Sequence, residues 1–324
     1  MASSAAFPII RLAIPYTSPP SRLRTLSLYF PRPLEESDPA NTVWVIYIHG
    51  GAWRDPLQTA QCIEPTLAHF TNRVPSLNKI AAIASINYRL SPYPTHPTDP
   101  SSKDDEERNA KHPDHVRDVK EALAWLRREY GVGQSNRGGK GFKWIGVGHS
   151  CGATLLLQLI AGVGLPPKDE GSTTTALAHP SALILLAGIY NIPLLLENHQ
   201  QPSSSPEFAA IYKDIIQGAF GKEKSAWEDA SPSYHPPVFL HSMGLTSVML
   251  AHSPYDELVE KEQDEAMLRS LKSSGWTAVE ENYSQSQRGL VECRNLSGSH
   301  DFVWEEGSQV AELISEVIPR VIMQ

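Results

Sequence analysis

The stretch that decides the fold runs from residue 142 to residue 162 and reads FKWIGVGHSCGATLLLQLIAG. Its first part, Phe142–Gly148, is apolar and predicts a buried strand, and Cys151–Gly162 predicts a helix. Between them, Gly148-His149-Ser150-Cys151-Gly152 has the form G-x-S-x-G. A serine at such a turn adopts a strained backbone conformation that exposes its hydroxyl, and the flanking glycines leave room for neighbouring backbone. The stretch therefore predicts a strand–turn–helix elbow with Ser150 as a nucleophile.

The same glycines admit a second interpretation, a loose dinucleotide-binding pattern through Gly146, Gly148 and Gly152. Three features disfavour it. Gly146 lies inside the predicted strand, the unit is not the first strand–helix–strand unit of the chain, and a Ser/Thr-rich loop stands where an acidic strand end is needed. We therefore favour the elbow, in which Ser150 rather than the adjacent Cys151 holds the position of the nucleophile.

Strands and helices alternate along the rest of the chain. Apolar and β-branched runs predict further strands at Ile9–Ile14, Thr25–Tyr29, Thr42–His49, Ile80–Tyr88, Ser181–Ile189, Ser247–His252 and Gly289–Leu296. Helical spacing of apolar residues predicts helices from Pro113 to Tyr130 and over Glu207–Phe220, Val259–Leu271 and Val303–Val321. The alternation predicts one α/β domain, residues 1–324, in which a mostly parallel sheet of about eight strands has helices on both faces.

Three stretches interrupt this alternation. Ser91–His112 and Pro166–Pro180 are rich in Pro, Ser, Thr or charge and predict surface loops. The region from Tyr190 to about Pro237 is long enough to predict a lid-like insertion at about 190–237, since long excursions from a compact domain often cover an active site. A surface insertion without a role at the site is the alternative.

The composition excludes several classes of protein. There are 28 Lys and Arg against 36 Asp and Glu, a net charge of −8. Nucleic-acid and anionic-membrane partners are therefore not expected, because binding phosphate needs clustered basic residues. The longest apolar stretch, Ala153–Leu165, contains Gln158 and is shorter than the ~20 residues of a membrane helix.

The cysteines and the N-terminus indicate an intracellular protein. Cys62, Cys151 and Cys293 are odd in number and scattered, which disfavours a disulfide framework, and no Cys or His spacing indicates zinc. The first residues lack the basic and apolar regions of a secretory signal. We therefore expect a reduced, soluble, intracellular protein with no metal and no other cofactor.

A second motif, His49-Gly50-Gly51-Ala52-Trp53, follows a predicted buried strand, and we call these residues the HGGAW loop. In open α/β sheets, ligands bind at that end of the strands. Adjacent glycines let the N–H groups of Gly50 and Gly51 point at one place, and the N–H of Cys151 joins them, so that the three can stabilise an oxyanion. His49 is a candidate for bracing this loop by hydrogen bonding; a plain structural turn is the alternative for the motif alone.

A serine is a weak nucleophile by itself and needs a base and an orienting acid. Asp256 and His300 each follow a predicted strand, on the same edge of the sheet as Ser150. The order Ser, Asp, His is that of the α/β-hydrolase arrangement. A neutral histidine can take the serine proton, and a carboxylate on its other nitrogen selects the tautomer. Glu257 is the alternative acid, and Asp301 is expected to cap its loop.

Other polar and aromatic side chains lie beside these motifs. His149 and His252 are expected to serve packing or local hydrogen bonds. Trp53, Phe302 and Trp304 are candidates for a slot that binds a flat aromatic substrate, and packing in the core or lid is the alternative for each.

Together, the HGGAW loop, the elbow at Ser150, the Asp256 loop and the segment from His300 to Trp304 resemble kynurenine formamidases of the α/β-hydrolase type, close to the fungal members. The HGGxW motif is the most specific part, because related carboxylesterases more often carry HGGG. The resemblance implies hydrolysis of N-formyl-L-kynurenine to L-kynurenine and formate, in tryptophan catabolism and the route to NAD.

The resemblance also assigns roles to residues of the site. It implies Ser150 as nucleophile, Asp256 as acid, His300 as base and a metal-free, homodimeric, cytosolic enzyme. A broad-specificity carboxylesterase of the same fold and a catalytically silent binding protein of that fold remain alternatives.

Overall fold

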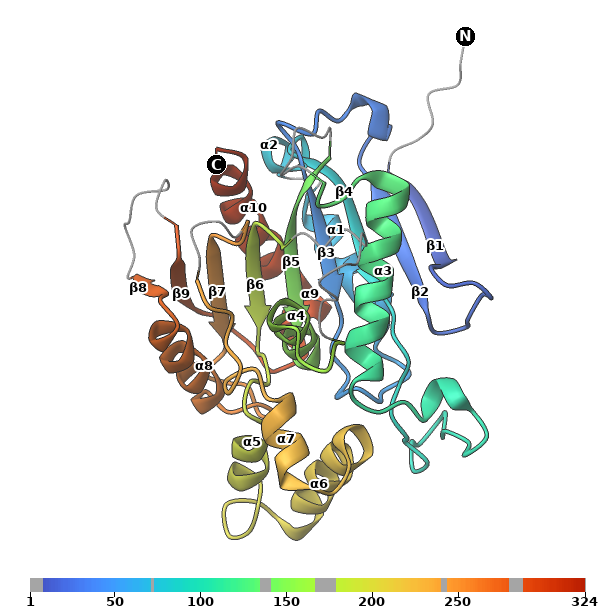
Figure 1. Ribbon diagram of the computed structural model, residues 1–324, viewed down its shortest axis with the longest axis vertical. Coiled ribbons are helices and arrows are strands. Elements are labelled where there is room, and N and C mark those ends of the chain that lie inside the picture. The colour runs from blue at the N-terminus through green and yellow to red at the C-terminus, as the bar shows by residue number, and fades with distance from the viewer. Residues whose placement is uncertain are drawn as a thin grey trace.

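The computed structural model describes residues 8–70, 73–134, 141–166, 179–239, 244–279 and 288–323. Its centre is a nine-stranded sheet in the order β1-β2-β4-β3-β5-β6-β7-β9-β8 (Figure 1). The strands are β1 (Ile9–Pro15), β2 (Thr25–Phe30), β3 (Val43–Ile48), β4 (Ile80–Ile86), β5 (Lys143–His149), β6 (Ala182–Leu186), β7 (Ser247–His252), β8 (Thr277–Val279) and β9 (Leu290–Asn295). β2 pairs antiparallel with β1 and β4, and the other neighbouring strands are parallel. The predicted α/β class with a mostly parallel sheet is confirmed.

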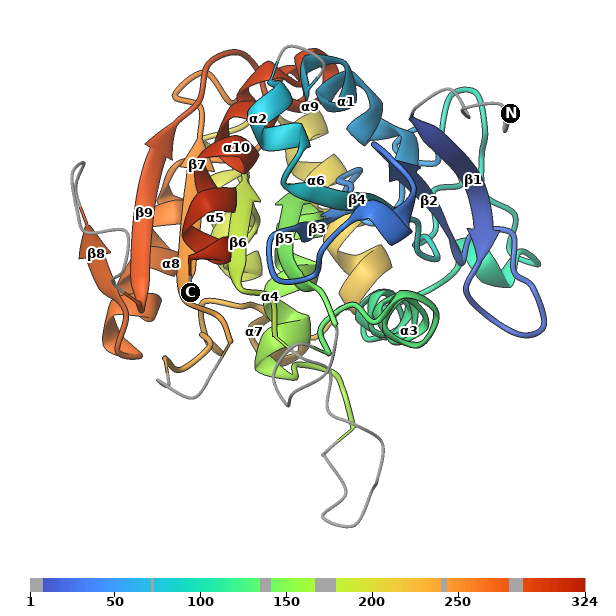
Figure 2. The ribbon, with the colours of Figure 1, turned by 90° about the horizontal axis from the view of Figure 1, so that it is seen from above.

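Helices cover both faces of this sheet (Figure 2). One face packs against α3 (Asp114–Tyr130), α4 (Cys151–Ala161) and α8 (Glu262–Ser273). The other packs against α1 (Glu64–Phe70), α9 (Phe302–Glu306) and α10 (Ser308–Ile322). The short α2 (Val74–Leu77) precedes β4.

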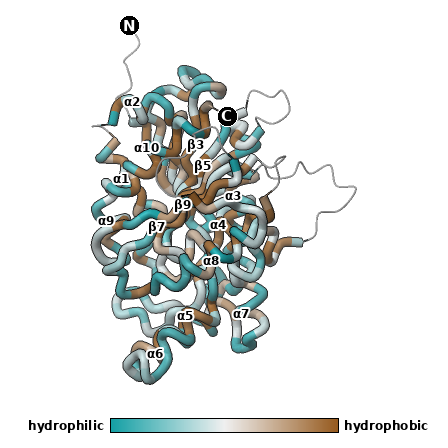
Figure 3. Tube along the Cα trace, turned by 90° about the vertical axis from the view of Figure 1, so that its left-hand side faces the viewer, coloured by the Kyte–Doolittle hydropathy of each residue, from teal (hydrophilic) through white to brown (hydrophobic). Residues whose placement is uncertain are grey.

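The strand β3 shows why its sequence is apolar throughout. Trp44, Ile46 and Ile48 enter the core on the α3–α4 side, and the alternate residues Val43, Val45 and Tyr47 enter the core on the α10 side. Successive side chains of a strand point to opposite faces, so a strand covered on both faces needs apolar residues at every position. Figure 3 shows the hydrophobic trace concentrated along β3 and β5 in the interior.

The region predicted as a lid-like insertion holds α5 (Ile192–Asn198), α6 (Pro206–Phe220) and α7 (Lys224–Ala230). These helices lie together beyond the carboxyl ends of the strands (Figure 1). They therefore stand over the edge where Ser150, Asp256 and His300 are expected.

Several local predictions were wrong. The helix expected over Val303–Val321 is two helices, α9 and α10, separated by Gly307 at φ 77°. A Cβ at Gly307 would lie 2.4 Å from the backbone N of Thr66, so the close approach of α1 needs a glycine there. The helix α8 begins at Glu262 rather than Val259, and the Val259 N–H is bound by Asp256 instead.

The irregular segments also differ from expectation. Ser91–His112 is no simple surface loop, since Ser91, His96 and Arg108 are buried and residues Glu106–Arg108 form a 3₁₀ turn. The edge strand β8 and the helix α1 were not predicted. Most of the loop expected at Pro166–Pro180, residues 167–178, lies outside the described residues. In the described part of the chain, no helix has both the length and the apolar character to cross a membrane.

Candidate active site

The elbow at Ser150 joins β5 to α4 with the strained geometry that its motif predicts. Ser150 has φ 53° and ψ −124°, a conformation that costs energy for any residue with a side chain. A Cβ at Gly152 would lie 2.2 Å from the carbonyl oxygen of Ile48, and one at Gly148 would lie 2.7 Å from the backbone of Gly152. The flanking glycines therefore allow three backbone segments to pass close together beneath the serine.

The structure brings His300 and Asp256 together. His300 Nδ1 lies 2.7 Å from Asp256 Oδ2, and both side chains are almost completely buried. The second oxygen of Asp256 accepts the backbone N–H groups of Leu258 and Val259, each at 2.9 Å. With the carboxylate accepting Nδ1–H, Nε2 of His300 is the nitrogen left for a serine proton.

Hydrogen bonds keep Asp256 ionised. Burial alone would raise the pKa of its carboxyl, but the hydrogen bond and charge of His300, with the two backbone N–H groups, outweigh burial and lower the pKa below its ordinary value. Glu257 lies differently, because its Oε2 accepts the backbone N–H of His300 at 3.1 Å and does not hold the ring. Of the two acids, the geometry favours Asp256.

The HGGAW loop turns beside the elbow in a left-handed conformation. Gly51, Ala52 and Trp53 all have positive φ, at 91°, 49° and 61°. The Trp53 N–H donates to the sulfur of Cys151 at 3.2 Å, which ties the loop to the first residue of α4. A Cβ at Gly50 would lie 3.0 Å from that of Ser150, so the glycine places its backbone against Ser150.

A tyrosine that the sequence analysis did not single out supports this loop. The Tyr88 hydroxyl lies 3.1 Å from the carbonyl oxygen of His49 and 3.0 Å from that of Gly50. Its ring stacks on His49, whose Nδ1 lies 2.9 Å from the same Gly50 oxygen. This contact is the kind of hydrogen bond by which we expect His49 to brace the loop. Burial lowers the pKa of His49 to about 4, so its ring is neutral at pH 7.

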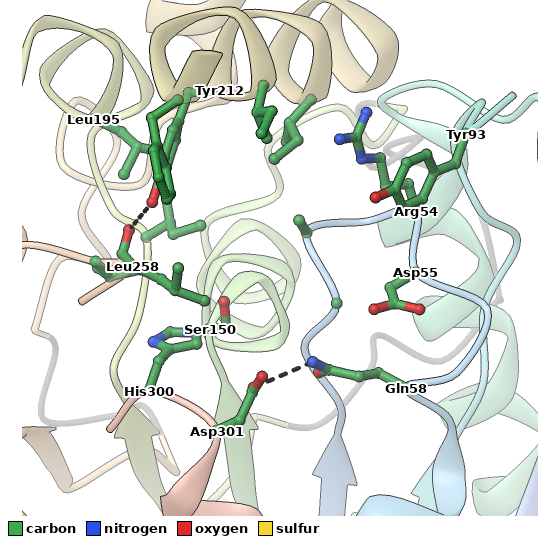
Figure 4. A pocket seen from close by; sticks show the side chains of 17 residues that line it. Arg54, Asp55, Gln58, Tyr93, Ser150, Leu195, Tyr212, Leu258, His300 and Asp301 are labelled. Atoms are coloured by element: carbon green, nitrogen blue, oxygen red, sulfur yellow. Dashed lines mark hydrogen bonds between the residues drawn. The ribbon is translucent and has the colours of Figure 1, made fainter. Parts of the chain in front are cut away.

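A pocket of about 260 Å³ opens beside Ser150 and His300. Figure 4 shows Ser150 and His300 at its base, between two walls of different character. One wall is apolar, with Ile189, Leu195, Phe208, Ile211, Tyr212, Ile215, Leu258 and Val259, and α6 supplies half of these residues. The opposite wall is polar, with Arg54, Asp55, Gln58, Tyr93 and Asp301, and Gly51 and Ala52 complete the lining.

The three aromatic residues proposed as a substrate slot lie elsewhere. In the described structure, none of them lines the pocket. Trp53 is fully buried with its ring edge-on to Phe220, with ring centroids 4.9 Å apart. Trp304 donates its indole N–H to Asp301, and Phe302 is partly exposed. Nearness in sequence to the motifs was a poor guide, because the insertion helix α6 supplies the wall instead.

The remaining polar residues hold the loops in place. Asp301 Oδ1 accepts hydrogen bonds from Gln58 at 3.1 Å and from Trp304 at 2.9 Å, a structural role of the kind expected for it. His149 Nε2 lies 3.1 Å from the carbonyl oxygen of His300, and His252 Nε2 lies 2.9 Å from that of Val259. These two histidines make the local hydrogen bonds that the sequence analysis expected.

One group of side chains has the composition of a metal site. His149, His300 and Asp301 bring ligand atoms within 4.8 Å of one another. Each of the three already has a protein partner: the His300 carbonyl for His149, Asp256 for His300, and Gln58 for Asp301. We therefore assign these side chains to the hydrogen-bond network of the site.

Comparisons with known proteins identify the family. A "kynurenine formamidase-like hydrolase fscH" from Fusarium equiseti is 33% identical over 311 residues, covering 94% of this chain and 93% of that protein. The kynurenine formamidase avaC of Aspergillus versicolor is 33% identical over 276 residues, covering 81% and 84%. The chain belongs to the kynurenine formamidase family. The BD-FAE family model also matches this formamidase homologue, over residues 26–271.

Solved structures agree with the fold of this kynurenine formamidase homologue. Esterase B from Lactobacillus rhamnosis superposes with a TM-score of 0.63 at 16% identity, covering 99% of this chain and 88% of that one. At this identity the likeness concerns the fold alone. The formamidase homologue is therefore a hydrolase with the α/β-hydrolase fold, as its sequence motifs predict.

Proposed function

We propose that the protein hydrolyses N-formyl-L-kynurenine to L-kynurenine and formate, with Ser150, His300 and Asp256 as its catalytic triad. The observation that carries this proposal is the buried hydrogen bond of 2.7 Å between His300 and Asp256, beside an elbow serine that lines the same pocket as His300. The names of the fungal relatives supply the class of substrate.

In this mechanism, Nε2 of His300 takes the proton of the Ser150 hydroxyl as the oxygen attacks the formyl carbon. The backbone N–H groups of Gly50, Gly51 and Cys151 stabilise the oxyanion of the tetrahedral intermediate. The intermediate collapses when the C–N bond breaks, and His300 returns the proton to the departing aniline nitrogen. Water then attacks the formyl ester on Ser150 with His300 as base, which releases formate and restores the hydroxyl.

The pocket is suited to this substrate. A formyl group is small and needs little room between Ser150 and the HGGAW loop. The flat aryl ring matches the apolar wall of α6, where Tyr212 and Phe208 offer aromatic surface. The α-amino acid arm carries both charges and matches the polar wall, where a guanidinium and two carboxylates are present.

The proposal extends to the setting of the enzyme. The product enters tryptophan catabolism and the route to NAD. We propose a cytoplasmic homodimer in which residues 1–324 act as one domain and α5–α7 move as a lid over the pocket.

Steady-state kinetics on the purified protein test the reaction. N-formyl-L-kynurenine should be hydrolysed at least about tenfold more efficiently than its N-acetyl counterpart, because a tight acyl site discriminates by size. The Ser150→Ala variant should lose about 10⁶ in kcat and keep its melting temperature. Equal kcat/KM on the formyl and acetyl anilides, or a preference for long-chain esters, would overturn the formamidase proposal and favour a carboxylesterase.

A further inference from the structure

Arg54, the residue that follows the HGGAW loop, is a buried cation in the polar wall of the pocket. Its side chain is only 5% exposed. Its guanidinium carbon lies 3.9 Å from the centroid of the Tyr93 ring, and Figure 4 shows the two side chains together on the wall opposite Tyr212. A buried guanidinium is costly unless other groups pair with its charge and its N–H donors.

The protein pairs only part of this guanidinium. Arg54 Nη1 donates to Asp214 Oδ2 at 2.6 Å, and in the described residues this is the hydrogen bond that the side chain makes. Asp214 belongs to α6, and its side chain is 63% exposed, so it meets Arg54 from the solvent side. A guanidinium carries several further N–H donors, and those of Arg54 are available to a ligand, because Arg54 lines the pocket.

The surroundings keep the guanidinium in one orientation. Stacking on Tyr93 fixes its plane, and the Tyr93 backbone N–H is itself bound by Ser101 at 2.7 Å. A planar fork of N–H groups held in this way matches the two oxygens of a carboxylate. Asp214 Oδ2 already occupies one such position, which shows that a carboxylate fits against this guanidinium.

Carboxylates on the same wall complete a pattern of opposite charges. Asp55 lines the pocket and accepts the Leu57 N–H through Oδ1 at 2.9 Å, which leaves its other oxygen for a ligand. Asp301 lines the pocket as well and uses Oδ1 for its protein partners. One cation with carboxylates beside it is what a zwitterionic amino acid needs.

We propose that Arg54 binds the α-carboxylate of the amino acid arm of the substrate, with Asp214 as a positioning residue that holds the guanidinium from the solvent side. This inference rests on the proposed function, because it assigns the arm of that substrate to the polar wall. The competing role for Arg54 is purely structural, a latch between the HGGAW loop and α6.

Two substrates separate these roles. N-formyl-L-kynurenine carries the amino acid arm, and 2′-formamidoacetophenone is the same aryl formamide without it. The measured quantity is the ratio of their kcat/KM values. Arg54→Met should lower this ratio by about 10²-fold, the scale of losing one partner of a hydrogen-bonded charge pair. Arg54→Lys should lower it less, since the charge stays and the fork is lost.

Matched variants and one modified substrate complete the experiment. Asp214→Asn should lower the ratio by less than about tenfold, because the cation remains. Arg269→Met removes an arginine of α8 that is 70% exposed and should leave the ratio unchanged. With the wild-type enzyme, kcat/KM for the methyl ester of N-formyl-L-kynurenine should fall below that for the acid by the same factor as Arg54→Met lowers kcat/KM for the acid. This comparison tests the role of the carboxylate without any change to the protein.

The possible failures are distinguishable. If the wild-type enzyme hydrolyses neither formamide, the proposed function fails and this inference falls with it. If the wild-type enzyme hydrolyses both, and Arg54→Met or Arg54→Lys lowers both kcat/KM values equally, Arg54 is only a latch. If the methyl ester is as good a substrate as the acid, the carboxylate does not bind at Arg54, even where the variants fail to fold.

Discussion

Replacement of Gly152 by alanine tests whether close backbone packing explains the second glycine of the elbow. A Cβ at this position would lie 2.2 Å from the carbonyl oxygen of Ile48 and 2.7 Å from that of His49. Both atoms belong to the backbone at the end of β3, in the middle of the sheet, and cannot move aside as a flexible side chain would. Overpacking of a rigid site costs about 1–3 kcal/mol, and this contact belongs at the upper end of that range.

The expected loss is a large one for this protein. About 3 kcal/mol corresponds to a fall in melting temperature of roughly 4 °C for a chain of this size. Helix propensity acts in the opposite direction, since alanine in a helix is favoured over glycine by roughly 0.5–1 kcal/mol. Without the close contact, Gly152→Ala would therefore stabilise α4. Thermal unfolding followed by circular dichroism directly measures whether Gly152→Ala raises or lowers the melting temperature.

Gly162, at the other end of α4, is the matched control. It has φ 75°, and no atom lies within 4 Å of the position that its Cβ would take. The free energy of unfolding of Gly162→Ala should therefore fall only by the conformational cost of a left-handed alanine, about 1 kcal/mol. The reasoning is refuted if Gly152→Ala melts at or above the temperature of Gly162→Ala.

Three further outcomes are expected. Tyr88→Phe removes the hydroxyl that binds two carbonyls of the HGGAW loop; it should lower kcat about tenfold with little change in KM, and a change in KM alone would contradict its positioning role. Asp256→Asn should lower kcat by about 10⁴ because the histidine then adopts the wrong tautomer, whereas Glu257→Gln should change kcat little. The reverse ranking would make Glu257 the acid of the triad. Burial lowers the pKa of His115 from 6.5 to about 3. The unfolded state therefore binds the extra proton, so the free energy of unfolding falls as the pH drops below 6.5, by about 1.4 kcal/mol per unit for this group. Urea titrations at several pH values should show that the free energy of unfolding of His115→Gln depends less steeply on pH. An identical slope would exclude His115 as a source of the pH dependence.

The sheet could be predicted from the sequence because most of its strands carry an unambiguous signal. Strands buried on both faces, such as β3 and β5, are continuous apolar runs bounded by polar residues or glycine. The edge strand β8 was missed because it is three residues long and partly exposed, so it has no such pattern. The break at Gly307 was missed because it depends on α1, which is distant in the chain.

The site divided in the same way. Ser150, Asp256 and His300 could be placed on one edge of the sheet, because strand ends and motif spacing are local signals. The walls of the pocket could not be predicted, since the apolar spacing of α6 indicates a helix but not which of its faces meets the HGGAW loop. Arg54 and Tyr93 are likewise brought together by the fold, and only the position of Arg54 directly after the motif hinted at a role.

The origin of the two pocket walls has a consequence for how selectivity can change. The proposed triad stands at strand ends of the central sheet, whereas Phe208, Ile211, Tyr212 and Ile215 come from one helix of the insertion. Phe208 and Ile211 are about half exposed, so exchanging them leaves no cavity in the main core. Under the proposed function, natural or laboratory variation in α6 can therefore alter which aryl group is accepted while Ser150 and its partners stay the same. The proposed reaction and its specificity are then encoded in separate parts of the gene.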